Sequence, residues 1–256
     1  MRIVVALIAL IAVGAMGIVA HAQTTQDNEY TLQGSFSPNQ GKASKKDPRP
    51  VGLDIGWDVT EVSNLRPAVV ETYLIGVQGA AINGRLFPKC TSEKINGAGT
   101  DKGCSKAALM GSGTIRNDVG NDKNFADKSI KCDAAVRIYN GGDHAALFID
   151  GRPPTCAVSL ATAIKAPYVK MPGIGGVGFK FTVPTNLRHP IPGVSLAVKQ
   201  VRVSFGRKTV RRGGKTRGFF EAQMNCPKSR KVKVEAVFTS ESGASKTSSS
   251  ALACRP

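Results

Sequence analysis

The side chains best suited to act as a general base are two histidines, because imidazole titrates close to neutral pH. Beyond the first 22 residues only His144 and His189 occur. A serine hydrolase also needs a carboxylate that orients the histidine and a serine on a constrained turn. Asp143 precedes His144, but Gly111-Ser112-Gly113 is only a fragment of the G-x-S-x-G pattern. We therefore expect both histidines to be ordinary turn or loop residues, and we assign no catalytic residue.

Paired carboxylates offer a second chemistry, because glycosidases place two acids on either side of the scissile bond. Asp54 and Asp58 lie on one face of a predicted strand, and Glu71 follows on the next. Alternating acids are also common on the exposed face of half-buried strands, and we favour this structural interpretation over a catalytic one. A secreted hydrolase acting on envelope polysaccharide stays open as the alternative. It requires these three acids and the two histidines to converge in one cleft.

A polar loop between residues 117 and 129 carries oxygen-bearing side chains of the kind that Ca²⁺ prefers. Its acids include Asp118, Asp122 and Asp127, but their spacing departs from the calcium-loop pattern, and Lys123 and Lys128 would oppose a cation. No C-x-x-C motif occurs, so the cysteines do not indicate a zinc site. We expect no metal and no cofactor.

Positive charge is the most unusual feature of the sequence, whose formal net charge is +17 at pH 7. Residues 199–233 hold twelve Lys and Arg against Glu221 alone, a net charge of +11. The candidate binding residues are the six central ones, Arg207, Lys208, Arg211, Arg212, Lys215 and Arg217. The electrostatic field of such a cluster attracts an anionic partner, and salt weakens this attraction.

Outside a cell, the anionic partner of this cluster would be wall polymer, polysaccharide or a membrane surface. Exposed Lys and Arg also keep a hairpin soluble and block edge-to-edge strand pairing, and the sequence leaves both interpretations open. Nucleic acid is disfavoured, because aromatic residues that could stack on bases are sparse beside the cluster.

Six cysteines indicate three disulfides, because an even number in an exported chain is typical of an oxidising compartment. They are Cys90, Cys104, Cys132, Cys156, Cys226 and Cys254. Of the 15 connectivities that six cysteines allow, we favour nearest neighbours, which are 90–104, 132–156 and 226–254. Each of these pairs brackets one local unit.

The stretch from Ser129 to Cys156 predicts a hairpin that the second disulfide closes. Apolar and polar residues alternate over 130–139, turn-forming residues fill 140–144, and residues 145–149 return as an apolar run. If Tyr139 faces Ala145, then Cys132 faces Arg152, close to Cys156.

Strand-like alternation recurs along the rest of the chain. It covers residues 30–37, 51–62, 69–82, 109–117, 177–183, 196–209, 217–225 and 231–238. A short helix is predicted to begin with Thr91 or Ser92 as its cap. Residues 157–165 are compatible with either a strand or a helix. The prolines within residues 185–193 exclude regular structure there. We expect residues 196–209 and 217–225 to form a second hairpin turned by Gly213-Gly214. The serine-rich residues 240–250 have the composition of disorder, but a disulfide at Cys254 would hold them in place.

Several short blocks carry a resemblance to known proteins. They are Phe87-Pro88-Lys89-Cys90 with Cys104 after it, Gly111-Ser112-Gly113-Thr114, Tyr139-Asn140-Gly141-Gly142, the Pro-Pro-Thr-Cys block that ends at Cys156, and His189-Pro190-Ile191-Pro192-Gly193. The chain resembles a group of secreted, cysteine-containing, β-rich actinobacterial proteins that have no assigned function. The resemblance implies export and a single domain over most of the mature chain, and it implies no activity.

The first 22 residues predict a secretory signal peptide. Arg2 precedes an apolar run from Ile3 to Ala20, and Ala20-His21-Ala22 is an A-x-A cleavage pattern. An uncleaved membrane anchor is the alternative, because the run approaches the length that spans a bilayer. No second long apolar segment follows, so we expect no transmembrane segment after cleavage.

We therefore predict a single antiparallel β-sandwich over residues 23–256, jelly-roll-like, with local disulfides and one or two short helices. The predicted function is that of a secreted, non-enzymatic protein of the cell envelope or the extracellular space. It would bind anionic polymer through the basic hairpin region. The polysaccharide hydrolase is the alternative from a different class of protein.

Overall fold

The computed structural model describes residues 27–37 and 42–254, so the predicted signal peptide of residues 1–22 lies outside the described residues. The strands are β1 (Asn28–Ser37), β2 (Arg49–Glu61), β3 (Val70–Gln78), β4 (Ala80–Ile82), β5 (Leu109–Asn121), β6 (Ile130–Asn140), β7 (His144–Gly151), β8 (Leu160–Met171), β9 (Gly176–Thr182), β10 (Val194–Phe205), β11 (Thr209–Arg212), β12 (Lys215–Gly218), β13 (Phe220–Ala222), β14 (Lys231–Ser240) and β15 (Ser245–Ala253). The helices are α1 (Ser92–Ala98) and α2 (Thr185–Arg188), with short 3₁₀ turns η1 (Gly84–Leu86), η2 (Lys106–Ala108) and η3 (Pro172–Ile174). No helix in this described part is long and apolar enough to cross a membrane.

The strands pair antiparallel throughout. One continuous sheet runs in the order β15-β14-β3-β9-β8-β7-β6-β5-β10-β2-β13-β4, and β1 also pairs with β2. The hairpin β11–β12 forms a separate two-stranded sheet. Strands that are far apart in the sequence are therefore neighbours, as β2 is of β10 and β3 is of β14.

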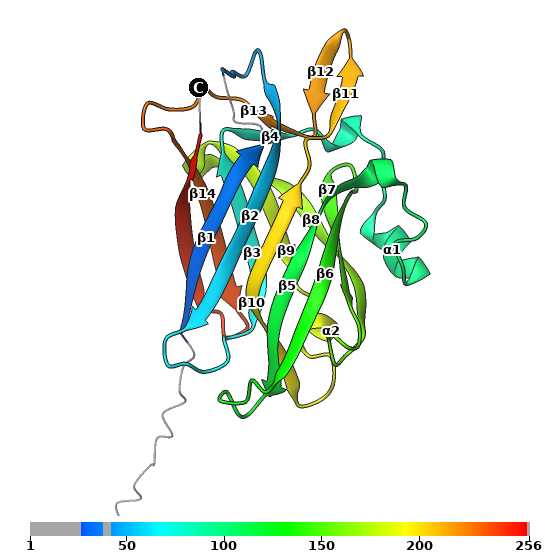
Figure 1. The fold of residues 1–256 in the computed structure, drawn as a ribbon, viewed down its shortest axis with the longest axis vertical. Coiled ribbons are helices and arrows are strands. Elements are labelled where there is room, and N and C mark those ends of the chain that lie inside the picture. The colour runs from blue at the N-terminus through cyan, green and yellow to red at the C-terminus, as the bar shows by residue number, and fades with distance from the viewer. Residues whose placement is uncertain (1–26, 38–41, 255–256) are drawn as a thin grey trace, which may run out of the picture.

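The large sheet curves until its end strand β15 lies beside β1, the strand that pairs with β2. The Ser248 hydroxyl on β15 donates to the Tyr30 carbonyl oxygen on β1 over 2.8 Å, and the Tyr30 ring stacks on Phe238 with centroids 3.9 Å apart. In Figure 1, β1, β2, β10, β5 and β6 form the near layer, and β14, β3, β9 and β8 lie behind them. The predicted all-β antiparallel fold with short helices is confirmed. The two layers expected of a sandwich are opposite sides of one curved sheet.

The core lies between these layers, because alternate side chains of each strand point inward. On β14 the alternation is regular, and Val232, Val234, Ala236 and Phe238 are at most 1% exposed, as predicted. Trp57 of β2 reaches across the core to Tyr73 of β3, with ring centroids 5.8 Å apart. Apolar burial from both layers therefore supplies the main stabilisation of the fold.

The three disulfides join nearest neighbours, which confirms the predicted connectivity: Cys90–Cys104, Cys132–Cys156 and Cys226–Cys254. The first brackets α1, whose cap at Thr91 accepts a hydrogen bond from the Lys94 amide over 3.3 Å. The third holds the end of β15 to the segment before β14. Each closes a short loop and is expected to contribute about 3 kcal/mol in the chain-entropy model.

Five local predictions differ from the structure or are decided by it. Tyr139 faces Ala146, one residue away from the predicted register, because four residues (141–144) and not the predicted five (140–144) lie between the last paired residues of β6 and β7. Residues 157–165 include the start of strand β8, residues 185–193 include the single turn α2, and the serine-rich stretch forms β15. The predicted second hairpin is wrong in its arms: β10 pairs with β2 and β5, and only the turn at Gly213-Gly214 is correct.

Candidate functional site

The hairpin β11–β12 projects from one end of the molecule, at the top of Figure 1. Its turn is Gly213-Gly214, with φ of 56° and 75°. A two-residue hairpin turn of this type requires positive φ at both positions, which glycine adopts without steric cost. The turn places Arg212 directly opposite Lys215.

Five cations of this hairpin segment are exposed: Arg207, Lys208, Arg211, Arg212 and Lys215. Within the described part of the chain, none of the five has a carboxylate oxygen within 4.0 Å. Their positive charge is therefore directed to solvent, and no carboxylate of the described residues neutralises it. These five residues are the core of the candidate site.

Arg217, the sixth residue predicted for the site, has a different role. Its guanidinium donates two hydrogen bonds of 2.9 Å to the carboxylate of Glu221, whose side chain is 0% exposed. Burial opposes the ionisation of Glu221, but hydrogen bonds from Arg217 and from the Gly218 amide outweigh it and lower the Glu221 pKa. Arg217 therefore attaches the hairpin to the body of the protein.

Two further basic segments lie at the same end of the molecule. Residues 42–49 precede β2, and residues 223–230 join β13 to β14; the Ala43 amide donates to Asn225 Oδ1 over 2.8 Å. Pairing of β13 with the start of β2 brings both segments beside the hairpin. Segments 42–49, 207–217 and 223–230 together hold twelve Lys and Arg and one acid, Asp47. We call these three segments the basic end.

Asp54 and Asp58, the candidate glycosidase pair, lie on the outer surface of the near layer. Asp58 accepts hydrogen bonds from Arg202 (2.7 and 2.8 Å) and Gln200 (2.7 Å); desolvation opposes its ionisation, yet these bonds lower its pKa. Asp54 borders a shallow groove that also contains Ser112 and Arg202. Neither histidine lines this groove, so the serine and the acid there have no base beside them.

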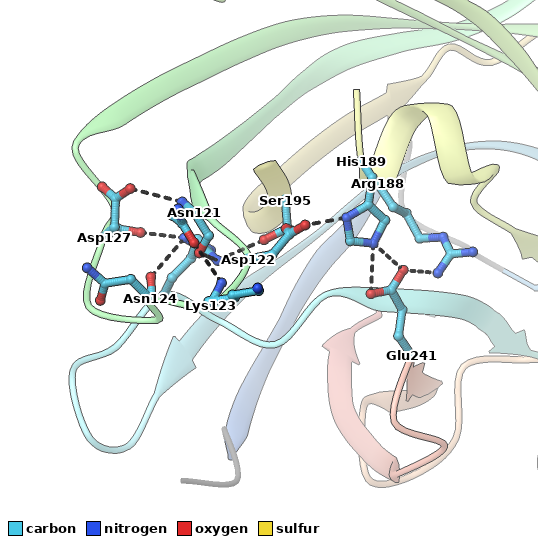
Figure 2. Close-up of polar contacts among 10 residues, drawn as sticks. Asn121, Asp122, Lys123, Asn124, Asp127, Arg188, His189, Ser195 and Glu241 are labelled. Atoms are coloured by element: carbon cyan, nitrogen blue, oxygen red, sulfur yellow. Dashed lines mark hydrogen bonds and ion pairs between the residues drawn. The ribbon is translucent and has the colours of Figure 1, made fainter. Parts of the chain in front are cut away.

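His189 directly follows α2, near the opposite end of the sheet (Figures 1 and 2), and Glu71 contacts Arg188 of α2. His189 Nε2 is 2.8 Å from Glu241 Oε1, and its Nδ1 is 3.5 Å from Asp122 Oδ1. Arg188 contacts Glu241 and is 3.0 Å from Glu71. These contacts hold α2 to the turn between β14 and β15, which is a structural role.

His144 is at a third location, at the start of β7. Its side chain is 4% exposed, and its Nδ1 is 2.7 Å from Asp143 Oδ1. The three acids and two histidines that a hydrolase would need therefore lie on the near layer, around α2 and at the β6–β7 turn. They do not converge in one cleft.

The loop considered for calcium is organised around an arginine that the sequence did not single out. Arg66 is 1% exposed and donates to the carbonyl oxygens of Asn121 (2.9 Å) and Asp127 (2.5 Å), and to the Ser195 hydroxyl (2.7 Å). Figure 2 shows the loop residues Asn121, Asn124 and Asp127. Asp127 accepts from the amides of Asn121 and Ser129, which lowers its pKa. In the described residues no group of three potential ligands could hold a metal ion.

The fold and the charge distribution define a class of protein: an all-β protein with three disulfides and one strongly basic end. Comparison with family models, with curated proteins and with solved structures finds no match to this chain. The resemblance to secreted actinobacterial proteins therefore stays a prediction.

Proposed function

We propose that this protein is exported and acts at the cell envelope as a non-enzymatic protein that binds an anionic polymer through its basic end. The observation that carries the proposal is the group of five exposed hairpin cations that have no carboxylate partner in the described structure. Three disulfides support export, because such bonds persist in oxidising compartments.

The arrangement of the charges favours binding over solubility alone. Arg212 and Lys215 face each other across the hairpin, and like charges in that position destabilise a strand pair. Solubility and protection of a strand edge require only scattered charge of either sign. Here segment 42–49 joins segments 207–217 and 223–230, from which it is distant in the sequence, and together they bring charge of one sign to one end, which is what recognition of an extended polyanion requires.

A polymer fits the basic end better than a membrane surface does. Peripheral membrane binding combines charge with apolar side chains that insert into the interface. The exposed large hydrophobic residues of the described chain are Val62, Ile130 and Ile191, and none belongs to the basic end. The ligand we propose is therefore a soluble or wall-attached chain of phosphate or carboxylate groups.

The first prediction concerns retention on polyanions. The variant R207Q/K208Q/R211Q/R212Q is expected to elute from immobilised polyphosphate and polygalacturonate at lower NaCl concentration than the native protein. Its affinity at low ionic strength should fall about fourfold or more, because four exposed ion pairs contribute about 0.2–1 kcal/mol each. Elution gradients and binding isotherms at several salt concentrations measure this change.

The matched control is K102Q/K106Q/K170Q/K180Q, which removes the same charge from exposed positions outside the basic end. It should retain most of the native affinity. Equal losses in the two variants would show that net charge alone drives retention and would reject a localised site. Binding to phosphatidylglycerol vesicles without binding to either polymer would reject the polymer in favour of a membrane.

A further inference from the structure

The core between the two layers contains a cavity of about 130 Å³. Strands of both layers form its wall, with Ile55 and Val201 on one side and Ile75 and Phe179 on the other. Protein interiors are normally packed with few voids larger than a water molecule, and side chains around a void lose the contacts that would fill it. The chemistry of the wall decides what could restore those contacts.

The wall presents carbon to the cavity. Three of its residues, Trp57, Tyr73 and Asn117, carry polar groups, but the indole nitrogen, the phenol oxygen and the amide oxygen have practically no accessible surface. The amide nitrogen of Asn117 donates to the Cys132 carbonyl oxygen over 2.8 Å. No charged side chain of the described chain lines the cavity. An occupant would therefore receive no hydrogen bond and no ion pair from the side chains around it.

This wall excludes polar occupants. A buried water needs two to four polar partners, so the cavity does not suit water. An ion would lose its hydration without gaining a partner, and a hydroxyl would be buried without a hydrogen bond. An apolar molecule has no such cost and gains contacts with the wall. An apolar cavity of comparable size, about 150 Å³, stays dry and binds benzene.

We propose that this cavity is a binding site for a small, uncharged hydrocarbon of about the size of benzene. The volume sets the upper limit, because sites for drug-sized ligands measure about 300–1,000 Å³, and a sterol or a complete lipid is too large. The cavity lies in the core and shares no residue with the basic end. Either proposal can therefore fail without the other.

Trp57 makes the proposal directly measurable, because it lines the cavity and is the single tryptophan of the chain. The probes share one ring: benzene, phenol and benzoate. Benzene is expected to change the emission of Trp57 and to raise the unfolding midpoint with concentration, since it binds the folded state. Phenol should bind at least about tenfold more weakly, because its hydroxyl would be buried without a partner, and benzoate at pH 7 should not bind.

A variant that fills the cavity tests its location. Val201 is 4% exposed and belongs to the wall, so Val201→Phe places a ring in the space that benzene would occupy. Its benzene affinity should fall at least about tenfold, because the interior has no other room for the ligand. The control Val62→Phe makes the same change at a residue that is 57% exposed and does not line the cavity. It should bind benzene as the native protein does.

The native protein alone can overturn the proposal, even if Val201→Phe does not fold. If benzene changes neither the Trp57 emission nor the unfolding midpoint, the cavity does not bind a hydrocarbon of this size. Phenol or benzoate binding as tight as benzene binding would reject an apolar site. An unchanged benzene affinity in folded Val201→Phe would place the bound benzene outside this cavity.

Discussion

Replacing Arg66 with methionine is expected to lower the free energy of unfolding by about 3–5 kcal/mol, because three buried oxygen acceptors lose their donor at a cost of about 1–3 kcal/mol each. The guanidinium is 1% exposed and satisfies the Asn121 and Asp127 carbonyls and the Ser195 hydroxyl together. Methionine preserves the length and the apolar stem but donates no hydrogen bond. Denaturant unfolding with the disulfides intact measures the loss.

The control for Arg66→Met is Arg116→Met. Arg116 is 63% exposed and lies 3.9 Å from Asp133, so its loss should change stability by less than about 0.5 kcal/mol. Hydrogen exchange adds a local measurement, because the amides of residues 121–129 should lose protection first in the Arg66 variant. If the unfolding midpoint and the amide protection of Arg66→Met equal those of the native protein, the loop does not depend on the guanidinium.

A neighbouring glycine supports the same view of the loop. A Cβ atom on Gly120 would lie 2.2 Å from Arg66 Nη1 and 2.2 Å from the Asp127 carbonyl oxygen. Neither atom can move without breaking the hydrogen bond between them. The close approach of β5 to the guanidinium therefore depends on a residue without a side chain at position 120.

The parts of the fold that the sequence predicts are those governed by local rules. Alternation on β14 and on the middle of β2 identifies their buried faces, because side chains of a strand point to opposite sides in turn. Thr91 caps α1, and the two glycines form the turn between β11 and β12. Both effects involve only residues within four positions in the sequence. The disulfides follow from short separations between neighbouring cysteines.

The parts that the sequence does not predict depend on long-range pairing. Nothing in the sequence near Arg49 indicates that β2 pairs with β13, so the sequence does not predict that residues 42–49 contribute to the basic end. Arg66 looks like an ordinary loop arginine until β5 and β10 bring acceptors around it.

The β6–β7 register shows a different limit. The alternating pattern identified both strands, but the number of residues in the turn decides which side chains face each other. Residues 141–143 form the turn, and His144 is already in β7 and buried. A single residue therefore separates a histidine expected in a turn from one that belongs to the sheet.

Replacing Arg217 with methionine is expected to cost about 3 kcal/mol at neutral pH, because it leaves the buried Glu221 carboxylate without its cation. This cost lies at the lower end of the range for breaking a buried ion pair, because Arg217 is 34% exposed and water can partly replace its hydrogen bonds to Glu221. Glu221→Gln should cost less, because the arginine that remains can be hydrated. The double variant should recover part of the loss in Arg217→Met.

The pH dependence has a defined sign. The pKa of Glu221 is lowered in the folded protein, so its contribution to stability is fully present above its ordinary pKa of 4.5 and is lost as the pH falls through the lowered value. In Arg217→Met, burial without the arginine raises the Glu221 pKa, and protonation then relieves the strain. The stability difference between the native protein and this variant should therefore shrink as the pH falls from 7 to about 4.

The same variant links stability to the proposed function. Arg217 and Glu221 hold β12 to the body of the protein, whereas Arg211 and Arg212 extend into solvent. The Arg217 variant should therefore loosen the hairpin. It should weaken polyanion binding only modestly, because the exposed cations are still present. Denaturant unfolding at several pH values, with Glu221→Gln and the double variant beside it, checks the coupling. A difference between native protein and Arg217→Met that stays constant with pH would show that Glu221 does not carry the effect.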